Sequence, residues 1–114
     1  MNINEKAAVE NLGGQKELFK ELLLYCLELE EQRWKDIQDS FDKEDFKEYE
    51  LRIHALKGAM LSLGIDEMAR ISAQQEKACK EGDRKRVRQQ HADLYEMYNR
   101  AHRSIETFLK SYEI

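Results

Sequence analysis

The sequence has 114 residues, of which 37% are charged and 41% hydrophobic, with five glycines and no proline. A chain of this length fits one domain with a core of its own. Its formal net charge of −4 argues against general nucleic-acid binding. No apolar run approaches the roughly 20 residues that a membrane span requires, and the N-terminus lacks the features of a secretory signal. We therefore expect one soluble, cytoplasmic domain over residues 1–114, without a membrane or nucleic-acid partner.

The first part of the chain predicts a short helix followed by a long one. Asn4 is suited to cap a helix that Gly13 and Gly14 would end, since each glycine weakens a helix by about 1 kcal/mol. From Gln15 onward, apolar residues recur at spacings of three and four, which predicts one helix of roughly seven turns that ends near Phe41. The core positions expected along it are Leu18, Phe19, Leu22, Leu23, Tyr25, Cys26, Leu29, Trp34, Ile37 and Phe41.

A further helix is expected between Asp42 and Gly64. Asp42 is the expected N-cap, and Asp45 would lie in the first turn, where a negative charge meets the positive end of the helix dipole. Gly64 is typical of the left-handed residue that ends a helix. The apolar face of this helix is expected to carry Phe46, Tyr49, Ile53, Leu56, Met60 and Leu63.

Two more helices complete the predicted fold. Asp66 would begin the first, which Gly82 ends, and Asp83 would cap the second, which has the most regular apolar stripe in the chain. Short turns make consecutive helices reverse direction. The sequence therefore predicts an all-α fold, an antiparallel up-down-up-down four-helix bundle with a short extra N-terminal helix. We expect a monomer, because no second apolar stripe is left over.

His54 lies outside the apolar pattern of its helix. At about 100° per residue, it falls roughly 130° from the centre of the apolar stripe and should face water. Leu51 and Leu61 lie on the same outer surface, which is therefore unusually apolar. Lys57, three residues after His54, is close enough to share a ligand with it. Gly58 costs a helix about 1 kcal/mol relative to alanine, which suggests that open space is needed above the imidazole.

These residues suit phosphoryl chemistry. A neutral imidazole is a nucleophile, and a phosphoryl group is a natural electrophile for it. Lys57 would offset the negative charge of the phosphoryl oxygens. The chain has neither a carboxylate cluster for a metal ion nor the glycine-rich loop of a nucleotide site, so we expect no metal, no cofactor and no enzyme activity of its own. An ordinary solvated surface remains the alternative for these residues taken alone.

A wider motif extends from this helix. Its positions are His54, Ala55, Leu56, Lys57, Gly58, Leu63, Gly64, Glu76, Gly82 and Asp83. The motif closely resembles that of the histidine phosphotransfer (HPt) domain family, and the resemblance covers most of the chain. It implies a four-helix bundle whose histidine accepts a phosphoryl group from an aspartyl phosphate on one receiver domain and passes it to another.

The resemblance also implies roles for individual residues. His54 takes the place of the phosphoryl acceptor, Lys57 that of the charge-neutralising residue, and Gly58 that of the residue giving access. Gln75 and Glu76 fall in the region whose polar side chains orient the imidazole. One departure from the family pattern lies next to Gly58, where this chain has alanine and many members have a small hydroxyl residue. A hydrogen bond from that position is therefore not expected.

The predicted partners are receiver domains of response regulators or of a hybrid sensor kinase, of which this chain could itself be a part. The receiver would bring the Mg²⁺, and Leu51 and Leu61 are the candidate docking residues. Two alternatives remain open. The chain could be the phosphoryl-accepting domain of a chemotaxis-type histidine kinase, or a helical scaffold that binds a receiver without chemistry.

Overall fold

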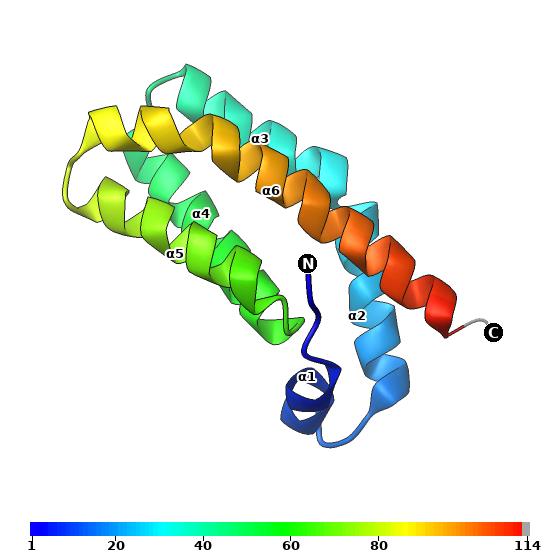
Figure 1. The fold of residues 1–114 in the computed structure, drawn as a ribbon. Coiled ribbons are helices and arrows are strands. Elements are labelled where there is room, and N and C mark those ends of the chain that lie inside the picture. Colours follow the sequence, from blue (N-terminus) through cyan, green and yellow to red (C-terminus); the bar gives the residue numbers. More distant parts are fainter. Residues whose placement is uncertain (113–114) are drawn as a thin grey trace.

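The computed structural model describes residues 1–112, and its regular structure is helical (Figure 1). The described part contains six helices: α1 (Glu5–Asn11), α2 (Lys16–Glu28), α3 (Glu30–Asp42), α4 (Phe46–Ser62), α5 (Asp66–Lys80) and α6 (Arg84–Ser111). No strand occurs within residues 1–112, so the expected all-α class is confirmed. The predicted single domain also includes residues 113 and 114, which lie outside the described residues.

Local signals set several helix ends as the sequence predicts. The side chain of Asn4 accepts a hydrogen bond from the backbone N–H of Ala7 at 3.2 Å and so caps α1. Asp83 caps α6 in the same way, through the N–H of Arg86 at 3.1 Å. Each cap satisfies one of the backbone donors that the first turn of a helix leaves unpaired.

Gly64 has two reasons to be glycine. It has a φ of +72° at the end of α4, a conformation that side-chain-bearing residues rarely adopt. A Cβ there would also lie 2.5 Å from the backbone oxygen of Asn4, because the N-terminal segment passes directly over this turn. The N–H of Asn4 donates to the oxygen of Gly64 at 2.8 Å. The N-terminal segment is therefore joined to the turn between α4 and α5.

The prediction of one long helix from Gln15 to Phe41 is wrong. The chain ends α2 at Glu28 and starts α3 at Glu30, and Figure 1 shows the two helices running in different directions. Next to this break, the hydroxyl of Tyr98 on α6 donates to the backbone oxygen of Glu30 at 2.7 Å. This bond joins α6 to the first residue of α3. The apolar stripe continues across the break, so periodicity alone did not reveal it.

The predicted cap of α4 is also corrected. Asp45 is the N-cap, with its carboxylate accepting from the N–H of Glu48 at 3.2 Å, whereas Asp42 is the last residue of α3. The turn between them is made at Glu44, which has a φ of 55°. No glycine or proline marks that turn. Arg88 on α6 forms an ion pair of 3.1 Å with Glu44, so α6 passes beside this turn.

The helices enclose one core. α4 packs against α3 and α5, while α6 packs against α5 and α2. Trp34 is half-buried and stacks on the ring of His91, as a core aromatic would. Tyr25, also expected in the core, is 56% exposed, because Leu23 and Cys26 on either side of it in sequence form the buried face of α2 and Tyr25 points to the outer side. The expectation that Tyr25 lies in the core is therefore wrong.

Candidate functional site

The centre of the candidate site joins two helices. His54 projects from the middle of α4, and its side chain is 62% exposed, as predicted. Its Nδ1 atom lies 2.6 Å from Oε2 of Glu76 on α5. The Glu76 side chain is only 5% exposed, so the imidazole is in water while its partner is buried beneath it. The structure thus brings together two of the residues that the sequence singled out.

Two lysines also reach Glu76. Nζ of Lys57 lies 2.6 Å from Oε1, and Nζ of Lys80 lies 3.4 Å from Oε2. Lys57 comes from the turn of α4 after His54, and Lys80 comes from the turn of α5 after Glu76. One buried carboxylate therefore accepts two hydrogen bonds, from His54 and Lys57, and forms an ion pair with Lys80, and a buried charge is tolerated when it is paired and hydrogen-bonded in this way.

The charge of Glu76 decides which tautomer the neutral imidazole of His54 adopts. Burial raises the pKa of Glu76, but hydrogen bonds from Lys57 and His54 outweigh it and lower the pKa to about 2. An ionised carboxylate only accepts hydrogen bonds, so Nδ1 of His54 carries the hydrogen and donates. In the neutral form of the ring, the lone pair is then on Nε2. The exposed imidazole is therefore held with one nitrogen occupied and the other available as a nucleophile.

The surface around His54 is open. A Cβ built on Gly58 would have no neighbouring heavy atom within 4 Å, so α4 packing does not require glycine there. Leu51 and Leu61 are 58% and 53% exposed on the same helix. Beside Leu51, a groove of about 360 Å³ runs between α3 and α4 and includes Leu29 and Leu51 in its lining. The site is thus an accessible imidazole on a partly apolar surface.

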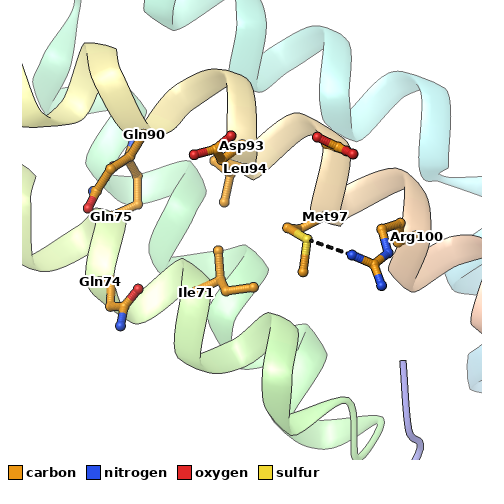
Figure 2. A pocket seen from close by; sticks show the side chains of 9 residues that line it. Ile71, Gln74, Gln75, Gln90, Asp93, Leu94, Met97 and Arg100 are labelled. Atoms are coloured by element: carbon orange, nitrogen blue, oxygen red, sulfur yellow. Dashed lines mark hydrogen bonds between the residues drawn. The ribbon is translucent and has the colours of Figure 1, made fainter.

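Gln75 does not take the place expected for it. Its amide donates to the hydroxyl of Tyr49 and to the backbone oxygen of Val87, both at 2.9 Å, and its oxygen accepts from Gln90 at 2.6 Å. Figure 2 shows Gln75 and Gln90 together at a pocket between α5 and α6. One residue along a helix turns the side chain by about 100°, so Gln75 and Glu76 face different neighbours. The expected contact between Gln75 and the imidazole is corrected: only Glu76 of this pair bonds His54.

The sequence reasoning missed Lys80. The signal was present, because Lys80 follows Glu76 by four residues, which places the two on one face of a helix. The spacing could not show, however, that His54 would meet the same carboxylate from the neighbouring helix.

Within residues 1–112, no group of three or more His, Cys, Asp or Glu side chains is placed to hold a metal ion. None of the helices formed by these residues is long and apolar enough to cross a membrane.

Comparison with known proteins gives one family. The model of the Hpt domain matches residues 21–104, which is most of the chain and includes His54, Lys57, Gly58 and Glu76. Neither the curated proteins nor the solved structures compared with the chain give a match. The family match covers α3, α4, α5 and most of α2 and α6, so it contains both helices that form the site. The chain belongs to the Hpt domain family, whose members are histidine phosphotransfer modules of phosphorelays.

Proposed function

We propose that this chain is a phosphorelay intermediate in which His54 accepts a phosphoryl group from a receiver-domain aspartyl phosphate and passes it to another receiver. The observation that carries the proposal is the contact between Nδ1 of His54 and the buried carboxylate of Glu76 at 2.6 Å, combined with the 62% exposure of the imidazole. This arrangement occupies Nδ1 and leaves Nε2 on the side of the ring that another protein can reach.

The transfer is a displacement at phosphorus. Nε2 of His54 supplies the electron pair of the new N–P bond, and the bond between phosphorus and the aspartyl oxygen breaks. The receiver aspartate leaves with that electron pair as a carboxylate. Nδ1 keeps its hydrogen, so the ring gains positive charge, which the carboxylate of Glu76 stabilises across the 2.6 Å contact. Return of the phosphoryl group to a second receiver reverses the same step.

The site supports this reaction but needs a partner to complete it. Lys57 adds a positive charge beside the ring, and Gly58 leaves room for the incoming receiver. Phosphoryl transfer generally also uses a metal ion held on carboxylates. We propose that the receiver supplies Mg²⁺ together with its aspartate. The described residues of this chain then provide the nucleophile, the positioning carboxylate and a docking surface.

Leu51 and Leu61 are the proposed docking residues. Each lies on α4 within two turns of His54, and both are more than half exposed. Large exposed apolar side chains on a charged surface are typical of interaction sites. A receiver seated on both would cover the imidazole between them.

The finer architecture is part of the same proposal. α2 and α3 together form one member, with α4, α5 and α6, of an antiparallel up-down-up-down bundle. Support comes from the turns of a few residues between consecutive helices and from the packing of each helix on its neighbours. We propose further that residues 1–114 act as one monomeric, cytoplasmic domain and not as an enzyme.

Label transfer tests the proposal. The protein would be incubated with a receiver domain carrying labelled aspartyl phosphate, and the label on this chain should be lost in acid and kept in alkali, as expected for a phosphohistidine. His54→Gln should take up no label, while His91→Gln, which changes a buried histidine, should still take it up. Binding of the receiver without label in the wild-type protein would favour the scaffold. Label obtained from a kinase domain and ATP, with no receiver present, would favour the chemotaxis-type module.

A further inference from the structure

The two lysines at Glu76 differ in how firmly they are held. The Lys57 contact is 2.6 Å long and the Lys57 side chain is 26% exposed, whereas the Lys80 contact is 3.4 Å long and the Lys80 side chain is 59% exposed. A short contact with a partly buried ammonium is strong, because water competes for it poorly. A longer contact at an exposed site contributes little. Lys80 can therefore move away from Glu76 more easily than Lys57 can.

The geometry of the Glu76 carboxylate favours loss of the Lys80 contact over loss of the Lys57 contact. Lys57 is the donor to Oε1, and moving it away would leave that buried oxygen without its short hydrogen bond. Lys80 shares Oε2 with Nδ1 of His54, which lies closer at 2.6 Å. Oε2 therefore keeps a partner when Lys80 departs. Because Lys80 and the imidazole meet at the same oxygen atom, the ammonium is also next to the ring that would carry the phosphoryl group.

We propose that Lys80 is the ammonium that moves from Glu76 to the phosphoryl group of phosphorylated His54, while Lys57 stays bonded to Glu76. The inference rests on the proposed phosphotransfer function and assigns the charge-neutralising role, expected for Lys57, mainly to Lys80. No covalent bond changes in this movement. The phosphoryl oxygens gain a charge-assisted hydrogen bond from Nζ of Lys80, and the Lys57 ammonium keeps the carboxylate in place under the ring.

The titration of the phosphoryl group itself tests this assignment. The full chain would be phosphorylated on histidine with phosphoramidate, and the ³¹P chemical shift of the phosphohistidine would be followed against pH. A neighbouring ammonium favours the dianion, so Lys80→Ala should move the titration midpoint up by roughly 0.2 to 0.7 pH units. Lys80→Arg should restore the wild-type midpoint, because a guanidinium also binds phosphate.

Lys77 provides the matched control. It lies on α5 like Lys80, is 71% exposed and pairs with Glu81 instead of Glu76. Lys77→Ala removes the same charge from the same helix and should leave the midpoint unchanged. Equal midpoints for Lys80→Ala and Lys77→Ala would overturn the assignment, as would a shift in Lys57→Ala larger than the one in Lys80→Ala. Circular dichroism would verify that each variant is folded.

The same experiment distinguishes failure of the proposed phosphotransfer function from failure of the assignment of Lys80. Failure of the wild-type protein to form any phosphohistidine, or formation that persists in His54→Gln, would overturn the proposed function and this inference together. Phosphorylation of His54 with a midpoint insensitive to Lys80→Ala would overturn the inference alone.

Discussion

Two histidines of this chain show what makes one of them reactive. His54 lies on the outer face of α4 and bonds a carboxylate through one ring nitrogen. His91 lies on α6, is 7% exposed and has both ring nitrogens occupied, Nδ1 at 2.8 Å from the hydroxyl of Tyr49 and Nε2 at 2.9 Å from the amide oxygen of Gln38. Its ring also stacks on that of Phe41 at 3.8 Å between centroids.

The surroundings explain the different roles. Burial lowers the pKa of His91 to about 4, so its ring is neutral near pH 7. Because the Tyr49 hydroxyl accepts from Gln75, its hydrogen is free to point to Nδ1 of His91, and Nε2 then donates to Gln38. No lone pair of His91 remains for a substrate. A histidine becomes a nucleophile here only where one nitrogen is anchored and the other faces water.

The largest effect is expected from removing the anchor of the exposed histidine. Glu76→Ala should lower the rate of phosphoryl transfer from a phosphorylated receiver by about 10- to 100-fold, because the ring loses both its fixed tautomer and its orientation. Glu81→Ala, an exposed carboxylate one turn further along the chain, should leave the rate unchanged. Equal rates in the wild-type protein and Glu76→Ala would show that the carboxylate does not position His54.

The buried histidine should give the opposite pattern. His91→Phe keeps an aromatic ring next to Phe41 but leaves the Tyr49 hydroxyl and the Gln38 amide without their partner. The free energy of unfolding, measured by urea denaturation, should fall by about 1 to 3 kcal/mol. The rate of phosphoryl transfer by the folded protein should change by less than about a factor of two. The exposed neighbour Gln89, replaced by alanine, serves as the control. A large loss of transfer without loss of stability would contradict the separation of the two regions.

The two regions should also lose stability at different pH. The pKa of His91 falls from 6.5 to about 4 on folding, so its stabilising effect is complete above pH 6.5 and is lost as the pH drops toward 4. The pKa of Glu76 falls from 4.5 to about 2, so its contribution is complete above pH 4.5 and is lost toward pH 2. Each group adds a slope of up to about 1.4 kcal/mol per pH unit.

Urea denaturation would be measured between about pH 2.5 and 8, because the pKa values of carboxylates and imidazoles lie in roughly this range. These measurements separate the two contributions. His91→Phe should reduce the slope above pH 4, although part of it remains because burial also lowers the pKa of His102. Glu76→Gln should reduce the slope below pH 4.5. Reversal of the two windows would contradict the assigned states of these side chains.

The smallest effect is expected at Gly58, which tests the need for open space at the exposed histidine. Gly58→Ala should raise the free energy of unfolding by up to about 1 kcal/mol, because alanine favours the helix and its Cβ would meet no neighbour within 4 Å. Gly58→Leu should be folded as well but transfer more slowly than Gly58→Ala, since the longer side chain obstructs the receiver. Transfer by Gly58→Leu at the wild-type rate would show that the glycine does not serve access.

Features set by neighbours in the sequence were predictable. The caps at Asn4 and Asp83 and the end of α4 at Gly64 depend on one turn of backbone each, and all three are confirmed. The exposure of His54 followed from helical periodicity. The likeness to the Hpt family then pointed to Glu76, although only the folded chain places this residue under the imidazole.

Features set by tertiary packing were not predictable. The break between α2 and α3 lies beside a hydrogen bond from Tyr98, which is 68 residues away in sequence from the carbonyl it binds. Gln75 is buried, as its spacing from Met68 and Ile71 on α5 suggests, but its bonds to Tyr49 and Val87 depend on how α5 packs against α4 and α6, which spacing does not encode. Lys80 lies at the site only because Glu76, its partner on α5, also contacts His54 on α4. The sequence does not show that contact between helices.

The state of the two nitrogens of His54 is the most direct test of the whole interpretation. Long-range ¹H–¹⁵N NMR correlations of the imidazole, recorded before and after phosphorylation by a receiver, identify which nitrogen carries hydrogen and which carries phosphorus. We expect hydrogen on Nδ1 in the free protein and phosphorus on Nε2 in the phosphorylated protein. Phosphorus on Nδ1, or on a residue other than His54, would contradict the role assigned to the buried carboxylate of Glu76.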